Sequence, residues 1–227
     1  NTAAATTADL TAPATVTFYS DAGCASQVGG AGSGGVTIAS SGNVATIYFK
    51  STSGNALTIT AVDVEGNLAT ASQGFTILPS KLAFSSPAQT LKSGVCVSAS
   101  STVETRDSSD VAANVNALTA ITLSAPTGTT FYTGAACTGP SATITIGSGT
   151  SSQNFYFKSV LGNTVALTAV SGTLTMATQN AVFTPARLAF TSPSQTFMAA
   201  VASCSAGTTV QTRAENNTTV TNVTADT

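Results

Sequence analysis

The stretch KLAFSSP at residues 81–87 returns almost unchanged as RLAFTSP at residues 187–193. A second stretch, FYSDAGC at residues 18–24, returns as FYTGAAC at residues 131–137. Three further pairs keep the same order: YFKS at 48–51 and 156–159, GN at 54–55 and 162–163, and VETR at 103–106 with VQTR at 210–213. Matches that keep one order along the chain indicate internal duplication, so the fold is that of the repeat.

The matches divide the chain into one complete repeat and two partial ones. Residues 81–186 form the complete repeat, residues 1–80 match the back part of a repeat, and residues 187–227 match the front part. A partial repeat alone would expose strand edges and an open apolar face, which proteins avoid. The sequence therefore predicts that a neighbouring copy completes each partial repeat, along one continuous polypeptide or by strand exchange between subunits.

Charge is sparse. Lys, Arg, Asp and Glu make up 7% of the residues, and the net charge is −2. No basic patch is available for a nucleic acid, and the sequence has no run of about 18 apolar residues, so no membrane span is expected in it. Val, Ile, Leu and Phe alternate with Ser and Thr, which favours a folded chain with a hydroxyl-rich surface.

The four cysteines recur with the repeat. Cys96 and Cys204 hold the same early position, and Cys24 and Cys137 the same late one. With no Cys-x-x-Cys pair and no histidine, a zinc site is not expected. One disulfide per repeat is predicted: Cys96 with Cys137, and Cys204 with Cys24 of the neighbouring copy. Buried free thiols are the alternative. Disulfides imply an oxidising compartment.

Strand patterns dominate the chain. Residues 15–19, 44–49 and 56–62 read as β-strands, and the complete repeat holds seven or eight short strands between turn residues. This spacing predicts an all-β fold in which each repeat is a β-sandwich. An up-and-down barrel is less favoured, because Pro79 and Pro185 make the repeat junctions short and stiff.

The period-two alternation also predicts which side chains of the complete repeat face its core. Tyr132 and Tyr156 are expected on the opposite face from their phenylalanine neighbours. The predicted core residues are Phe84, Val103, Leu123, Phe131, Ile144, Phe155, Phe157, Val165 and Leu167.

Several of these segments resemble the immunoglobulin-like tandem repeats of long bacterial surface and fibre proteins. They are the LAF-x-SP opening, Cys96, VETRD at 103–107, the segment from Thr130 to Cys137, and FYFK at 155–158. The resemblance covers essentially the whole chain. It implies an all-β fold of tandem immunoglobulin-like β-sandwiches in a linear array. It also implies an extracellular or cell-surface adhesin, stalk or filament protein without catalytic activity.

The acidic residues are the remaining candidates for chemistry. Without histidine, no Ser-His-Asp or Cys-His arrangement exists, and we expect no catalytic residue and no cofactor. Asp63 with Glu65, and the group Glu104, Asp107 and Asp110, are close enough in sequence for calcium or acid–base chemistry. Turn geometry also selects Asp, and we interpret these residues as solvated turn residues rather than metal ligands.

Two further patterns have a functional and a simpler interpretation. Lys50 and Lys158 each follow an aromatic strand, where an isopeptide bond is conceivable, but a solvated strand-end lysine is favoured. Asn216, Asn217 and Asn222 begin N-glycosylation sequons, which we interpret as chance matches.

Taken together, the sequence predicts a structural subunit or segment of an extracellular filament or stalk, whose partners are copies of itself joined end to end. The alternative is an adhesin module that recognises a glycan or a host surface protein through the loops of its sandwiches.

Overall fold

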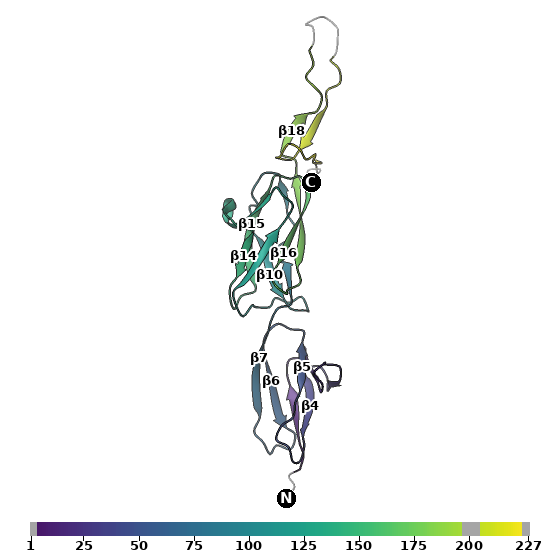
Figure 1. Cartoon of the computed structure of the whole chain (residues 1–227), viewed down its shortest axis with the longest axis vertical. Helices are drawn as coiled ribbons and strands as arrows, with labels where there is room; N and C mark the ends of the chain where they lie inside the picture. Colours follow the sequence, from purple (N-terminus) through teal and green to yellow (C-terminus); the bar gives the residue numbers. More distant parts are fainter. Residues whose placement is uncertain (1–3, 197–204, 224–227) are drawn as a thin grey trace. The chain divides into compact units, whose positions relative to one another are not determined.

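A computed structural model describes residues 4–196 and 205–223, and these residues are almost entirely β-structure (Figure 1). The only helical element among them is the short 3-10 helix η1 (Ala135–Cys137). The all-β fold class predicted from the sequence is therefore confirmed. Of the predicted sites, Cys204 lies outside the described residues.

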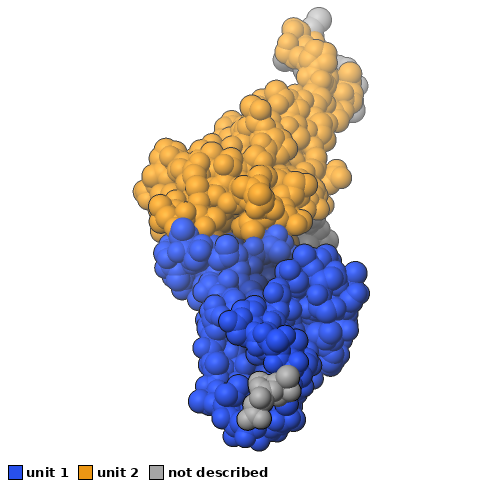
Figure 2. Space-filling view, turned by 60° about the horizontal axis from the view of Figure 1, so that its bottom comes forward, with its two compact units in different colours: residues 1–81, 105–117, 147–151 blue, residues 82–104, 118–146, 152–227 orange. Residues whose placement is uncertain are grey.

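The chain divides into two compact units, coloured separately in Figure 2. One unit comprises residues 1–81, 105–117 and 147–151, and the other comprises residues 82–104, 118–146 and 152–227. The division does not follow the repeat boundaries, because loops of the complete repeat group with the first 81 residues. The three-part domain division at 80/81 and 186/187 stays a prediction.

The first partial repeat forms two antiparallel sheets. One sheet has the order β4-β1-β6-β7 and the other the order β3-β2-β5. Their facing side chains form one core, with the Phe49 and Phe75 rings 4.8 Å apart across it. The strands are β1 (Thr6–Thr11), β2 (Val16–Tyr19), β3 (Gln27–Val28), β4 (Ser33–Ile38), β5 (Tyr48–Ser51), β6 (Asn55–Asp63) and β7 (Ala71–Ile77).

The complete repeat forms a β-sandwich of two five-stranded sheets. Their orders are β13-β12-β15-β10-β8 and β14-β11-β16-β17-β9, and only β9 pairs in parallel, with β17. The strands are β8 (Lys81–Phe84), β9 (Thr90–Lys92), β10 (Ser101–Arg106), β11 (Thr119–Ser124), β12 (Thr129–Gly134), β13 (Thr138–Pro140), β14 (Thr143–Ile146), β15 (Ser152–Ser159), β16 (Asn163–Val170) and β17 (Ala177–Thr184).

The last segment contributes one antiparallel pair, β18 (Arg187–Phe190) with β19 (Val210–Arg213). These strands repeat β8 and β10 in sequence, and they pair as a separate two-stranded sheet. A two-stranded sheet has little apolar burial of its own. Leu188 is 72% exposed, whereas Leu82 at the equivalent position of β8 is 4% exposed.

The predicted core of the complete repeat is confirmed at eight of nine positions. Strand alternation places Phe155 and Phe157 in the interior and leaves Tyr156 half-buried on the other face, and Tyr132 likewise lies opposite Phe131. Phe84 is the exception. It is only half-buried, since it lies near the end of β8, yet its ring packs edge-on against Phe155.

One predicted strand is much shorter than expected. Residues 44–49 read as a strand in the sequence, but β5 begins only at Tyr48. In the complete repeat, the matching strand β15 pairs along Ser152–Phe155 with β10. Among the described residues, no strand pairs with residues 44–47, although their side chains alternate in polarity. Apolar alternation alone therefore does not make a strand here, because a strand also needs a partner.

Phe155 packs against three other phenylalanine rings, so its replacement tests which strand faces form the core. Replacement Phe155→Ala removes a fully buried ring that contacts Phe84, Phe131 and Phe157, and should lower the free energy of unfolding by about 3–5 kcal/mol. Tyr156→Ala, which removes a similar ring from the opposite face, should cost about 1 kcal/mol. Urea denaturation followed by circular dichroism measures both. Equal losses would contradict the assigned faces.

Candidate functional site

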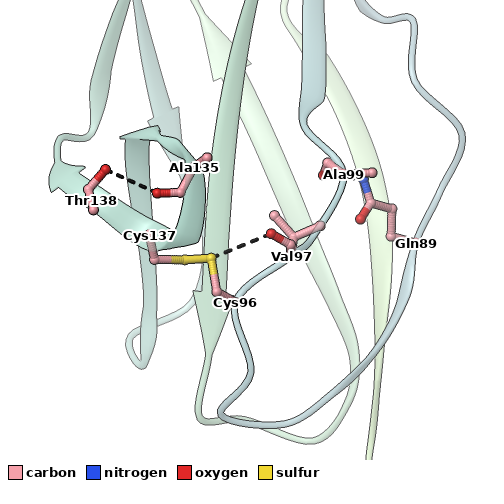
Figure 3. The surroundings of a disulfide bond; sticks show 7 residues. All are labelled: Gln89, Cys96, Val97, Ala99, Ala135, Cys137 and Thr138. Atoms are coloured by element: carbon pink, nitrogen blue, oxygen red, sulfur yellow. Dashed lines mark hydrogen bonds between the residues drawn. A yellow bond between two sulfur atoms is a disulfide. The ribbon is translucent and has the colours of Figure 1, made fainter.

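The disulfide of the complete repeat joins Cys96 to Cys137, the pair expected from the repeat (Figure 3). Cys96 lies in the irregular segment before β10, and its neighbour Val97 is buried and donates its backbone N–H to Phe157 O at 3.1 Å. Cys137 ends η1 with a positive φ of 57°. The bond therefore ties the entry to β10 to the end of β12, and both segments rest on β15.

Cys24 has no disulfide partner among the described residues. It is half-buried in a turn that Asp21 caps, where the carboxylate accepts backbone N–H groups from Ala25 and Ser26. These hydrogen bonds hold the pKa of Asp21 below its usual value. The turn thus fixes the thiol at the surface of the first sandwich, and its predicted bond to Cys204 of a neighbour stays a prediction.

The acidic residues that suggested calcium or acid–base chemistry are only partly the solvated turn residues that the sequence predicts: Asp63 caps a turn but is buried, and Glu104 lies in strand β10. Asp63 accepts the backbone N–H groups of Asn67 at 2.7 Å and Leu68 at 3.0 Å. Asp110 forms an ion pair with Lys81 at 2.9 Å. Within the described residues, no group of three or more His, Cys, Asp or Glu side chains is placed to hold a metal ion.

Asp107 does more than shape its own turn, because it reaches the preceding repeat. It is 3% exposed, and it accepts backbone N–H groups from Ser109 and Val111 in its loop. Its other oxygen accepts the N–H of Gly54 at 2.9 Å. Burial raises the pKa of Asp107. A larger lowering comes from the hydrogen bonds donated by Gly54, Val111 and Ser109 and from the charge of Lys81, so the pKa lies below its usual range.

Asn55, next to Gly54, completes this junction between the first two repeats. Its backbone adopts a left-handed φ of 75°. Its side-chain amide donates to Ala112 O at 3.3 Å and accepts from Asn114 N at 2.7 Å. A Cβ on Gly54 would overlap Ala113, so only glycine fits here.

The junction between the second and third repeats uses the equivalent residues. Asn163 has a φ of 63°, and its side-chain amide donates to Val220 O at 3.0 Å. Asn216 N donates to Val160 O at 3.1 Å. A Cβ on Gly162 would overlap the Thr221 side chain. The Gly-Asn turn is therefore an inter-repeat docking element, a role that its recurrence in the sequence did not by itself reveal.

An ion pair accompanies each junction. Lys81, the first residue of β8, pairs with Asp110, and the repeat-equivalent Arg187 pairs with Glu215 through two hydrogen bonds. The hydrogen bond from Arg187 lowers the pKa of Glu215. The two acids do not occupy equivalent positions, so the charge pairing is kept while the sequence of the loop differs.

An apolar groove of about 500 Å³ opens in the first sandwich beside β5. Its walls include Ile47, Phe49, Ile59 and Phe75, which are all half-buried. The positions equivalent to Phe49 and Ile59 in the complete repeat are Phe157 and Leu167, each 1% exposed. The same core positions are thus sealed in one sandwich and open in the other.

Two of the remaining candidate residues, Lys50 and Asn216, have local side-chain partners. Lys50 places its ammonium group 5.2 Å from the centre of the Tyr19 ring, as a strand-end lysine does. Asn216 uses both ends of its side-chain amide within its own turn, donating to Thr219 Oγ1 and accepting from Thr218 N. Asn217 and Asn222 are exposed.

No protein-family model matches the sequence, and no curated protein matches it. Solved structures with similar folds include a glycosyl hydrolase family 2 member from Bacteroides cellulosilyticus (12% identity, TM-score 0.37, covering 74% of this chain and 22% of that one). The Yersinia pseudotuberculosis adhesin InvE matches at 13% identity and TM-score 0.34, covering 79% and 49%. Domains 4 and 5 of the S-layer protein SbsC match at 13% and 0.31, covering 76% and 97%.

The chain spans about a fifth of the length of the family 2 glycosidases that it matches. Among the described residues, no helix has the length and apolar character that a membrane span requires.

The disulfide gives a second test. Replacing Cys96 and Cys137 together by Ala opens a loop of 41 residues, and the chain-entropy model gives a loss of roughly 4 kcal/mol in the free energy of unfolding. Cys24→Ser, which removes a thiol that has no disulfide partner among the described residues, should change it by less than about 1 kcal/mol. Guanidinium denaturation of each variant measures the losses. Equal stability of the oxidised and reduced parent chains would contradict a structural role for the bond.

Asp107 gives a third test. Its folded-state pKa lies below the unfolded value of about 3.9, so its contribution to stability is complete above about pH 4 and is lost as pH falls through the folded value. Asp107→Asn should cost about 1–3 kcal/mol at pH 7 and flatten the acid side of the stability curve. The control Asp110→Asn breaks only an exposed ion pair, worth about 0–1 kcal/mol. Urea denaturation from pH 2.5 to 7 measures both; parallel curves for Asp107→Asn and the parent would contradict the assignment.

Proposed function

We propose that this chain is a structural subunit or segment of an extracellular filament or stalk built from tandem immunoglobulin-like domains, with a mechanical rather than a catalytic role. The observation that carries the proposal is the recurrence of one docking geometry. Asn55 and Asn163 occupy equivalent positions, share the left-handed conformation, and each hydrogen-bonds the loop of the repeat that follows.

A repeated junction supports a mechanical role because the same Gly-Asn turn hydrogen-bonds the loop of the following repeat at both places. The linkers are short: β7 ends at Ile77 and β8 begins at Lys81, while β17 ends at Thr184 and β18 begins at Arg187. Pro79 and Pro185 fix φ within these linkers. Flexible arrays instead use long Gly- and Ser-rich linkers without lateral contacts.

The chemistry of the chain supports an extracellular location. A disulfide persists in oxidising compartments and is rare in the cytosol. With only 7% charged residues, the surface relies on Ser and Thr hydroxyl groups for solvation. The predicted bond between Cys24 and Cys204 of a neighbouring copy would give the array covalent continuity in the same compartment.

The adhesin alternative requires exposed side chains on the sandwich loops that could contact a ligand. Near Cys24, Phe18 is fully buried, and the Lys50 ammonium group lies 5.2 Å from the centre of the Tyr19 ring. These packing contacts favour the filament.

The filament proposal is tested on the oxidised full chain by negative-stain electron microscopy. We expect end-to-end rods with a regular spacing. Gly162→Ala and Gly54→Ala, which push a Cβ into the following repeat, should broaden the distribution of angles between domains. Gly147→Ala is the matched control, because its Cβ meets only Thr150 Oγ1 at 3.7 Å. Compact single particles at all concentrations would contradict the proposal.

A further inference from the structure

Strand β4 of the first sandwich is an edge strand without the features that usually protect an edge. It stands at one end of the sheet order β4-β1-β6-β7, so only one of its two sides pairs with another strand. Its sequence is SGGVTI, and the chain has no charged residue and no proline from Gln27 to Ile47. Proteins usually protect a sheet edge with lysine, proline or a bulge, because free edges pair with one another.

This edge is also an edge in the complete repeat. The equivalent strand there is β14, where residues 141–146 read SATITI against SGGVTI at residues 33–38. β14 likewise ends its sheet, and β9 joins that sheet at the opposite edge, beside β17. The position of β4 at an edge is therefore a property of the repeat when all its strands are present.

The ladder between β1 and β4 determines which backbone groups of β4 point outward. Just before β4, Gly32 O accepts a hydrogen bond from Ala12 N at 2.8 Å. Successive residues of an antiparallel strand bond to alternate sides. The even-numbered residues of β4 therefore bond to β1, and the N–H and C=O groups of Gly35 and Thr37 point away from the sheet.

A side chain covers the equivalent edge in the complete repeat. The Ser141 hydroxyl group donates to Thr143 O at 2.7 Å and accepts from Thr143 N at 3.1 Å, which satisfies both outward groups of that residue. Gly35 is the equivalent of Thr143. Ser33, the equivalent of Ser141, is itself part of β4 and pairs with Thr11. Within the described residues, no hydrogen bond reaches the outward groups of Gly35, so this edge is open where the other is closed.

We propose that β4 pairs with β4 of a second copy, antiparallel and about a two-fold axis at Val36, so that two chains associate side by side. Gly35 of each chain then faces Thr37 of the other, and each such pair exchanges both of its N–H···O=C bonds. The contact is lateral and uses neither end of the chain. It goes beyond the proposed filament function and does not depend on it.

A second copy is the occupant because the open edge is self-complementary. A two-fold axis places the outward donors of each strand against the outward acceptors of the other. The strand carries no charge, so two copies do not repel each other there. The acidic residue beside the edge is Asp9 of β1, which pairs with Gly35. Two Asp9 carboxylates would lie three strand spacings apart, about 14 Å, beyond the screening length of about 8 Å in physiological salt.

Single cysteines test this register on the full chain. Every variant carries Cys24→Ser and Cys204→Ser and keeps the native disulfide. In the proposed pair Val36 faces itself at a non-hydrogen-bonded position, with the two Cα atoms about 4.5 Å apart, a separation that a disulfide spans. The matched control is Thr37→Cys, whose two Cα atoms would lie more than about 7 Å apart. Dimers formed in a glutathione redox buffer are measured on non-reducing gels.

We expect Val36→Cys to form at least tenfold more cross-linked dimer than Thr37→Cys. Random collision predicts the opposite order, because Thr37 is exposed and Val36 is half-buried. Equal or reversed yields would therefore overturn the proposed pairing. No dimer from Val36→Cys would overturn the second copy as occupant and would leave a strand of a different protein as the partner of this edge.

A proline substitution provides a second measurement. Thr37→Pro removes an N–H group that points away from the sheet, and proline is tolerated at such edge positions. Added to Val36→Cys, it should reduce the yield of dimer at least tenfold. The matched control is Thr145→Pro at the equivalent position of β14, which should leave the yield unchanged. Circular dichroism shows that each variant is folded, and equal yields for the two folded proline variants would overturn the proposal.

Discussion

A β-strand is stable only where its backbone N–H and C=O groups find partners, and this requirement determines the architecture of the chain. Residues 44–47 and Ser152–Phe155 occupy the same position in two copies of one repeat. Ser152–Phe155 pairs with β10 and belongs to a strand of eight residues. Residues 44–47 pair with no strand among the described residues, and they are irregular.

The same requirement explains the two states of the core. Phe157 and Leu167 are sealed because strands close the sheet around them, whereas Phe49 and Ile59 line an open groove with the same chemistry. The apolar pattern is thus the same in both sandwiches, while the exposure of the equivalent core side chains differs.

The sequence predicted the β-class, the repeat and the alternation of the core because these depend on local patterns of period two and on similarity within the chain. It failed for residues 44–47, since pairing is a property of two segments and not of one. Asp107 was interpreted as a solvated turn residue. It does cap its turn, but its side chain is buried, because its second carboxylate oxygen accepts the backbone N–H of Gly54 in another repeat. No local pattern distinguishes an Asp that caps one loop from an Asp that joins two domains.

The disulfide has a consequence for a protein placed under tension. When a domain is pulled open from its ends, each residue that unravels adds about 3.3–3.6 Å to the length of the chain. The bond between Cys96 and Cys137 shields a loop of 41 residues from the pulling force. The complete repeat would therefore lengthen by roughly 140 Å less than an equal repeat without the bond. Under force, an array of such domains would therefore extend in shorter steps as each domain unfolds, while the polypeptide stays covalently intact.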